Sequence, residues 1–108
     1  YFYVEDAVEA YLSLAEGLAE DTIKPGEAFN FSNDEPLSVR EMCSHVMSAC
    51  PQTPLRVDIH NEASNEIQAQ HLSSKKARAR LGWTPSYSLV EGLKRTVEWY
   101  RNFLKEQS

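Results

Sequence analysis

The sequence has only two cysteines and four glycines in 108 residues, and it lacks the run of about 18 apolar residues that a membrane span needs. Because Cys43 and Cys50 stand seven positions apart in an expected helix, their Cα atoms would be about 10 Å apart. A disulfide needs a separation of about 7 Å or less. We therefore expect reduced thiols, no membrane span and, since no signal peptide is visible, a cytoplasmic location.

Patterns for catalysis and for metal binding are also missing. Cys43 and His45 would point to different sides of a helix, and His60 and His71 have no ligands nearby, so no metal site is expected. No Ser, His and acidic residue stand at a spacing that singles out a nucleophile and its base. The glycines are too scattered for Gly-x-Gly-x-x-Gly, the pattern that cradles a pyrophosphate. The chain alone is expected to be inactive, with no catalytic residues and no bound cofactor.

The charge is acidic, with a net value of -5 at pH 7. Binding to nucleic acid through its phosphates depends on clustered Lys and Arg, so this class of partner is excluded. One basic run exists at 75–80, and its two interpretations are a phosphate site and a solvated helix face. We favour the solvated face, because acidic residues dominate the rest of the chain.

Helix starts are marked by capping boxes, in which a first side chain accepts from the backbone and an acid three residues later reaches back. The boxes are Asp6 with Glu9, Ser38 with Glu41, and Ser88 with Glu91. With the apolar periodicity they predict helices at about 7–19, 39–49 and 89–105. A short helix at 75–81 would follow Ser73 or Ser74 and end at Gly82. The first helix has its apolar stripe at Val8, Tyr11, Leu12, Ala15 and Leu18.

Two short segments, 28–31 and 55–59, have the composition of strands. Because a helix separates them, a parallel, right-handed βαβ unit is predicted. The expected fold class is therefore α/β: a single domain over 1–108 with four helices and a short, two- to three-stranded, mostly parallel sheet. So small a sheet is weak alone, and the chain opens at Tyr1 without Met. We expect a fragment detached from a larger N-terminal domain.

Five segments carry a resemblance to a known family. They are Tyr1–Ala10, Gly26–Ser32, Leu37–Glu41, Ser73–Pro85 and Ser88–Leu93 with Thr96–Tyr100. In this order they resemble the C-terminal part of extended short-chain dehydrogenase/reductases, the NAD-dependent epimerase/dehydratase family, and above all its sugar-nucleotide 4,6-dehydratases. The fourth segment looks like the family turn Lys-Ala-Arg-x-x-Leu-Gly-Trp-x-Pro, in which we expect Trp83 to be a packing anchor.

The resemblance implies a two-domain enzyme. An N-terminal Rossmann domain would bind NAD or NADP and carry a Tyr-x-x-x-Lys catalytic pair, while a small C-terminal domain closes over the nucleotide-sugar. This chain matches only the second part, so it would be the substrate-side domain of a 4,6-dehydratase that lacks its Rossmann domain here. Two alternatives stay open: a 4-epimerase of the same family, and a free-standing binding module without activity. Uncovered surface would favour homodimers or domain-swapped forms.

The resemblance also implies substrate-binding residues. Counting back from Leu81-Gly82-Trp83 places a loop acid of the dehydratases at Glu66. Its carboxylate would accept hydrogen bonds from a base amino group or a ribose hydroxyl, and Gln68 would add an amide contact. A solvated loop acid is the alternative for Glu66. Where some relatives have Arg, this chain has Ala63 and Ala69, so the nucleotide is left unspecified.

Overall fold

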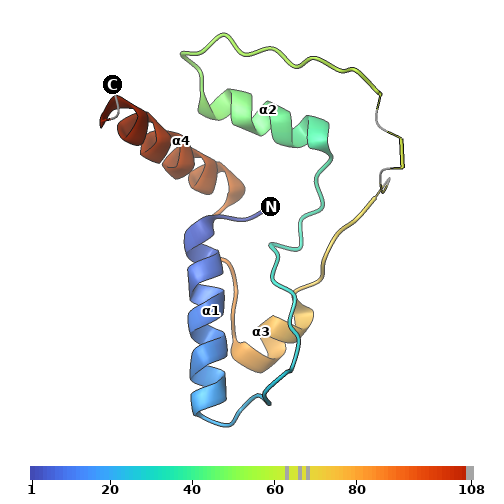
Figure 1. Ribbon diagram of the computed structural model, residues 1–108, viewed down its shortest axis with the longest axis vertical. Coiled ribbons are helices and arrows are strands. Elements are labelled where there is room, and N and C mark those ends of the chain that lie inside the picture. Colours follow the sequence, from blue (N-terminus) through green and yellow to red (C-terminus); the bar gives the residue numbers. More distant parts are fainter. Residues whose placement is uncertain (63, 66, 68, 107–108) are drawn as a thin grey trace.

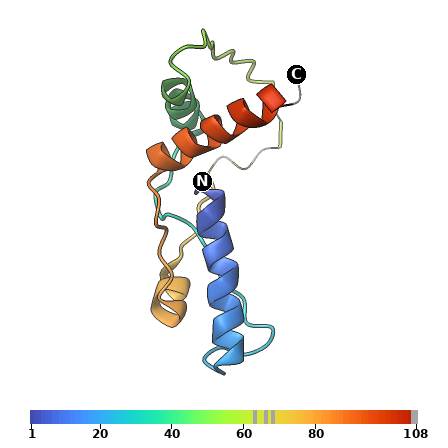
Figure 2. The same cartoon turned by 90° about the vertical axis from the view of Figure 1, so that its left-hand side faces the viewer.

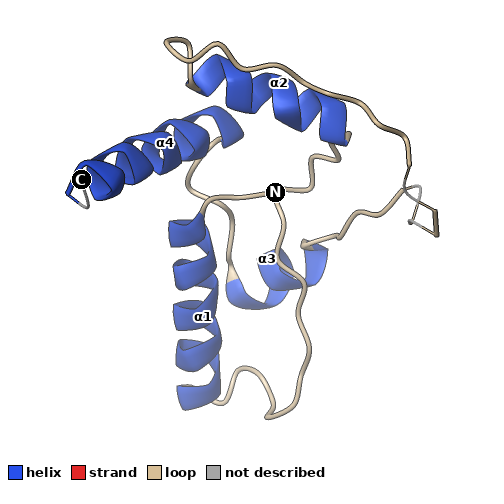
Figure 3. Ribbon diagram, turned by 45° about the horizontal axis from the view of Figure 1, so that its top comes forward, coloured by secondary structure: helices blue, strands red, loops and turns tan. Residues whose placement is uncertain are grey.

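The computed structural model describes residues 1–62, 64, 65, 67 and 69–106, and the regular structure in this part of the chain is helical (Figure 1). Its elements are α1 (Val4–Ala19), α2 (Val39–Ala49), α3 (Lys75–Leu81) and α4 (Leu89–Glu106). α3 packs beside α1, and α4 packs beside α2 (Figures 1 and 3). The predicted helices at 39–49 and 75–81 are confirmed with both their bounds.

The predicted parallel sheet is wrong: within the described residues there is no strand, and the fold is all-helical instead of α/β (Figure 3). The segment 28–31 passes beside α3, whereas 55–59 runs along the edge of α2 that faces away from α3 (Figure 1). The two segments do not meet, so neither finds a partner for a backbone ladder. The apolar residues of the second segment are also uncovered, with Leu55, Val57 and Ile59 at 39%, 46% and 51% exposure.

The start of α1 differs from the prediction because Asp6 has another role. The helix begins at Val4, and its N-cap residue Tyr3 makes no side-chain capping bond. Asp6 is 1% exposed, and its Oδ1 accepts a hydrogen bond from the Ser86 backbone N–H at 2.6 Å. The capping box of Asp6 with Glu9 is therefore wrong, since a tertiary contact engages the carboxylate.

The other helix ends follow their local sequence signals more closely. The Ser38 box is complete: Ser38 Oγ accepts from the Glu41 N–H at 3.2 Å, and the Glu41 carboxylate accepts from the Ser38 N–H at 2.8 Å. At α4, Ser88 Oγ accepts from the Glu91 N–H at 3.2 Å, while the Glu91 carboxylate accepts from Arg95 Nε at 3.0 Å. Gly82 ends α3 with a left-handed φ of 64°, as predicted.

The hydrophobic core is small and centres on Trp83, which is 4% exposed. Phe2 and Phe31 meet its ring edge-on, with centroids 5.9 and 5.0 Å away. Ala10 and Ala77 fill the space where α1 and α3 approach each other. The indole Nε1 donates to the Asp6 carbonyl at 3.1 Å, so the polar atom of the buried ring is satisfied. Trp83 is thus a packing anchor, which confirms the expectation.

Candidate functional site

A groove of about 1010 Å³ opens between the N-terminal residues, the loop that precedes α2 and the segment that precedes α3. Its volume is at the upper end of the range for small-molecule sites, about 300–1,000 Å³. It is lined by the aromatic residues Tyr1, Phe2 and Phe31 and by polar residues that include Asn33, Gln70 and His71. Aromatic rings beside amide and imidazole groups suit a ligand with a ring face and polar edges.

One wall of the groove is held by the carboxylate of Asp34, whose side chain is 33% exposed. Its Oδ1 accepts from the Ser74 backbone N–H at 2.8 Å, and its Oδ2 accepts from the Ser74 hydroxyl at 2.6 Å and from Arg78 Nε at 3.1 Å. Ser32 Oγ lies 3.0 Å from Asp34 Oδ1 and 2.8 Å from the Leu72 carbonyl, so its single proton can go to either acceptor. We call Ser32, Asp34, Ser74 and Arg78 the Asp34 clasp.

The clasp keeps its carboxylate charged. The hydroxyl and the backbone N–H of Ser74 lower the pKa of Asp34 far below its ordinary range, and Ser32 and Arg78 add to this shift. Asp34 also has a left-handed φ of 57°, a conformation that Asp tolerates better than most residues. The side-chain oxygen of Asn33 accepts from the Glu35 N–H at 3.2 Å and closes the turn. The loop that lines the groove is therefore fixed to the start of α3.

Most of the basic run at 75–80 is exposed, as the favoured interpretation of a solvated helix face expects, but two of its cations also pair with the 22–34 segment. Lys76 Nζ lies 3.1 Å from a Glu27 carboxylate oxygen, donates to the Ala28 carbonyl at 2.8 Å, and sits 4.4 Å from the Phe29 ring centroid. Arg80 pairs with the same Glu27 oxygen at 3.0 Å and donates to the Thr22 carbonyl at 2.9 Å. These side chains join α3 to the 22–34 segment, so they do not form a cluster of unpaired cations that could bind a phosphate.

The predicted substrate-binding residues Glu66 and Gln68 lie outside the described residues, as does Ala63. Their described neighbours Ile67, Ala69 and Gln70 line the groove. The clasp residues were missed as site residues, although the sequence carries a partial signal for them. Ser74 was recognised as a helix start and Arg78 as part of a basic run, but Asp34 is 40 residues away from Ser74.

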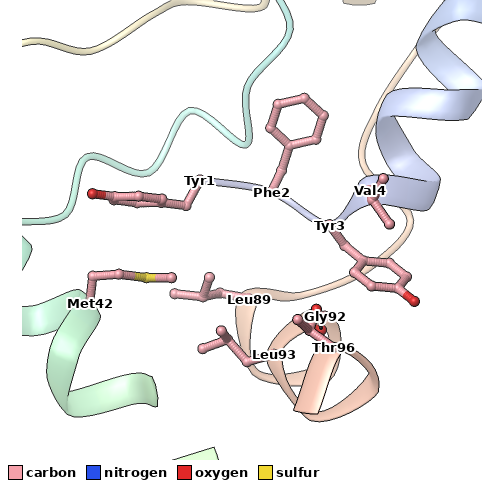
Figure 4. A pocket seen from close by; sticks show the side chains of 9 residues that line it. All are labelled: Tyr1, Phe2, Tyr3, Val4, Met42, Leu89, Gly92, Leu93 and Thr96. Carbon is pink, nitrogen blue, oxygen red and sulfur yellow. Dashed lines mark hydrogen bonds between the residues drawn. The ribbon is translucent and has the colours of Figure 1, made fainter. Parts of the chain in front are cut away.

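A second, smaller cavity of about 270 Å³ lies between the N-terminal segment and the α2–α4 pair (Figure 4). Figure 4 shows Met42, Leu89 and Leu93 beneath the Tyr1 ring, so this cavity is an apolar seam. Its one hydroxyl-bearing helical residue, Thr96, already donates to the Gly92 carbonyl at 2.8 Å. The cavity is therefore apolar, and its lining helices present no uncommitted polar side chain to a ligand.

The described part of the chain holds neither a metal-binding cluster nor a membrane-spanning helix. No group of three or more His, Cys, Asp or Glu side chains there could hold a metal ion. No helix there combines the length and the apolar character that crossing a membrane requires.

Comparison with known proteins then places the chain among enzymes named for nucleotide sugars. No family profile matches it, and no solved structure matches it. UDP-glucose 4-epimerase of Mycolicibacterium smegmatis is 32% identical over 94% of the chain, and dTDP-D-glucose 4,6-dehydratase of Homo sapiens is 31% identical over 94%. UDP-glucuronate 4-epimerase 2 of Arabidopsis thaliana is 23% identical over 98%.

These relatives are named as nucleotide-sugar epimerases and dehydratases. The chain belongs to their family, the NAD-dependent epimerase/dehydratase family of short-chain dehydrogenase/reductases, as the resemblance of its segments indicated. The chain spans 31%, 29% and 26% of the length of the three relatives, so less than a third of each relative corresponds to it.

Proposed function

We propose that residues 1–108 form the substrate-side domain of an NAD- or NADP-dependent sugar-nucleotide 4,6-dehydratase. The observation that carries this proposal is the match to dehydratases over nearly the whole chain but less than a third of their length. The parent protein, the gene product that contains residues 1–108, would act in the cytoplasm. Its remaining part, a Rossmann domain, would perform hydride transfer and water elimination.

The described residues do not fit a dinucleotide cofactor, which supports this division. A pyrophosphate is normally held where a glycine-rich turn opens a helix. Here the residues that precede α1 and α2 are Tyr3 and Ser38, and the two glycines with positive φ, Gly26 and Gly82, do not open a helix. The cofactor and the catalytic pair are therefore assigned to the rest of the parent protein, and no chemical step is assigned to this chain.

The groove is the part of this chain that we assign to the nucleotide-sugar. The rings of Tyr1, Phe2 and Phe31 offer faces for a base or a sugar, and the side chains of Asn33 and Gln70 offer hydrogen bonds. The loop that carries Glu66 and Gln68 would add a carboxylate and an amide. The Asp34 clasp supports this assignment because it holds one wall in place before any ligand arrives.

A 4-epimerase is the second candidate, and the relative from M. smegmatis favours it. Dehydratases and epimerases both occur among the relatives at similar identity, so identity does not separate them. A free-standing binding module is the third candidate. It predicts tight binding of a ligand by residues 1–108 alone, whereas the domain proposal predicts weak binding until the rest of the parent protein is present.

The test is turnover by the parent protein. UDP-, dTDP-, GDP- and CDP-linked sugars are incubated with NAD or NADP, and the products are read by NMR. A 4-keto-6-deoxy sugar supports the dehydratase, and a C4 epimer supports the second candidate. Turnover of none of these compounds, together with no binding of any by calorimetry, contradicts both.

The role of Glu66 is tested in the same assay. Loss of a hydrogen bond to a charged acceptor is worth about 1.5–3 kcal/mol, so Glu66→Ala is expected to raise KM about 10- to 100-fold. Glu62→Ala is the matched control, because Glu62 is an 82% exposed acid of the same loop. Equal KM values for both variants would remove Glu66 from the site.

A further inference from the structure

The segment between α3 and α4 runs beside α1 and is bonded to the start of that helix (Figures 1 and 2). Asp6 Oδ1 accepts from the Ser86 backbone N–H at 2.6 Å, and Glu5 accepts from the Tyr87 hydroxyl at 2.7 Å. The backbone carbonyl of Asp6 accepts from Trp83 Nε1 at 3.1 Å. Two neighbouring acids in the first turn of α1 therefore fix the course of this segment.

The burial of Asp6 is costly for the fold. The residue is 1% exposed, and its Oδ2 has no hydrogen-bond partner in the part of the chain that the structure describes. A buried carboxylate oxygen without a partner destabilises a protein, although the dipole of α1 favours a negative charge in its first turn. An apolar side chain in such a place is often no less stable. Stability thus explains Asp6 poorly, whereas its charge-assisted bond to Ser86 gives the segment a defined position.

Trp83 connects this arrangement to the groove. Its indole meets the rings of Phe2 and Phe31 edge-on, with centroids 5.9 and 5.0 Å away. Both phenylalanines line the groove. Neither Asp6 nor Trp83 does, so Asp6 can affect a ligand only through the indole that it binds. A displaced indole would leave both phenylalanine rings without the contact that orients them.

Tyr87 connects the same segment to the groove by a second route. Its ring meets the ring of Tyr3 edge-on, with centroids 5.0 Å apart. Tyr3 is also close to α4, because a Cβ at Gly92 would lie 2.9 Å from Tyr3 Cβ. Since Phe2 directly precedes Tyr3 in the chain, the position of Tyr3 determines where Phe2 enters the groove lining.

We propose that Asp6 and Tyr87 are positioning residues of the groove: they fix the segment between α3 and α4 to the start of α1 and thereby hold the aromatic lining in place for a ligand. This inference rests on the proposed function, which assigns the groove to the nucleotide-sugar. A lining that is ordered before the ligand arrives lowers the entropy cost of binding. Because the reacting groups are assigned to the rest of the parent protein, loss of either contact should raise KM and leave kcat unchanged.

The experiment measures KM and kcat of the parent protein with the nucleotide-sugar that it turns over. Asp6→Ala removes the acceptor of the Ser86 N–H, Asp6→Asn keeps one oxygen for it, and Glu9→Ala is the control, since Glu9 is an exposed acid of the same helix. Asp6→Ala is expected to raise KM about 10-fold, and Asp6→Asn to restore part of this loss. A merely structural role would lower the folded fraction, and so the apparent kcat, without changing KM. Equal KM values for Asp6→Ala and Glu9→Ala overturn the proposal.

A second pair of variants makes a smaller change. Tyr87→Phe removes only the hydroxyl that donates to Glu5, and Tyr100→Phe is the matched control, because Tyr100 is an exposed residue of α4. Tyr87→Phe is expected to raise KM about 3-fold, less than Asp6→Ala does, because the lost hydrogen bond is exposed. If Asp6→Ala does not fold, this pair decides the matter, and equal KM values for its two members overturn the proposal.

A measurement that needs no turnover lets this proposal and the proposed function fail separately. 4-Fluorophenylalanine in place of Phe2 puts a fluorine on a ring beside the Trp83 indole, and its resonance in the parent protein is read by NMR. Asp6→Ala and Tyr87→Phe are expected to shift this resonance, whereas Glu9→Ala should leave it unchanged. An active protein whose resonance does not move overturns the positioning role and leaves the function standing. A shifted resonance in a protein that turns over no nucleotide-sugar refutes the function and keeps the control of the groove lining.

Discussion

The α1–α3 region and the α2–α4 region are held together by different kinds of contact. In the first, Trp83 is buried, and side-chain hydrogen bonds join residues 40 or more positions apart, such as Ser74 with Asp34 and Trp83 with Asp6. In the second, α2 has no fully buried residue along its described length, and the only one in α4 is Gly92. Directional polar bonds define one arrangement, whereas half-buried apolar side chains tolerate several. The region that holds the groove wall is therefore the more precisely built one.

The tryptophans test this difference most strongly, because each region has one. Trp83 is 4% exposed and Trp99 is 56% exposed. Replacing a buried aromatic residue by Ala costs about 3–5 kcal/mol, whereas a surface change stays within about 0.5 kcal/mol. In urea denaturation followed by circular dichroism, the free energy of unfolding should fall strongly for Trp83→Ala and hardly at all for Trp99→Ala. Similar losses for both would erase the distinction between the regions.

Acid should act on the first region through the Asp34 clasp. The folded-state pKa of Asp34 is lowered from its ordinary value of 3.8, so the unfolded chain takes up a proton first as the pH falls below that value. The clasp therefore contributes stability above about pH 4 and loses it in more acidic solution. Asp34→Asn should be less stable than the unsubstituted chain at pH 7, and the gap should narrow as the pH falls from 4 to 2.5.

Urea midpoints across this pH range measure the effect of the clasp. Asp58→Asn is the control, because the Asp58 side chain is 84% exposed, and its midpoints should follow those of the unsubstituted chain. A gap between Asp34→Asn and the unsubstituted chain that stays constant with pH would contradict a role for the charge.

The glycines probe how closely each region is packed. A Cβ at Gly92 of α4 would lie 2.9 Å from Tyr3 Cβ, which is fixed to the backbone, while the nearest atoms to one at Gly17 are in the side chains of Ile23 and Leu81, at 3.2 Å or more. Overpacking costs about 1–3 kcal/mol, and Ala in place of Gly returns up to about 1 kcal/mol in a helix. Gly92→Ala should therefore lower the thermal midpoint more than Gly17→Ala. The reverse order would mean that the N-terminal segment moves aside for the added methyl group at a low cost in free energy.

The smallest effect is expected at the helix caps. Ser38 closes a complete capping box at α2, whereas Ser88 closes half of one at α4. Loss of an N-cap side chain costs about 1 kcal/mol, and the reciprocal bond from Glu41 should be weakened too. Ser38→Ala should thus destabilise the chain more than Ser88→Ala, as measured by the urea midpoint. Equal shifts would indicate that the Glu41 carboxylate contributes nothing.

Features that depend on neighbours in the chain could be read from the sequence alone. The Ser38 cap and the left-handed Gly82 act over three or four residues, and the helices that they bound have the predicted ends. Family membership could also be predicted, because it depends on the order of short segments. The roles of Glu66 and Gln68 stay predictions, since both residues lie outside the described part of the chain.

Features that depend on distant partners were decided by the tertiary structure. The segment 55–59 has the alternation of a strand, but a strand needs a partner, and none of the described residues supplies one. Asp6 has the pattern of a cap, yet the Ser86 N–H engages its carboxylate. The stripe of α1 was visible as a pattern, but the face that packs is the one with Ala10 and Gly17. Periodicity states which residues share a face; only contacts across the fold decide which face is covered.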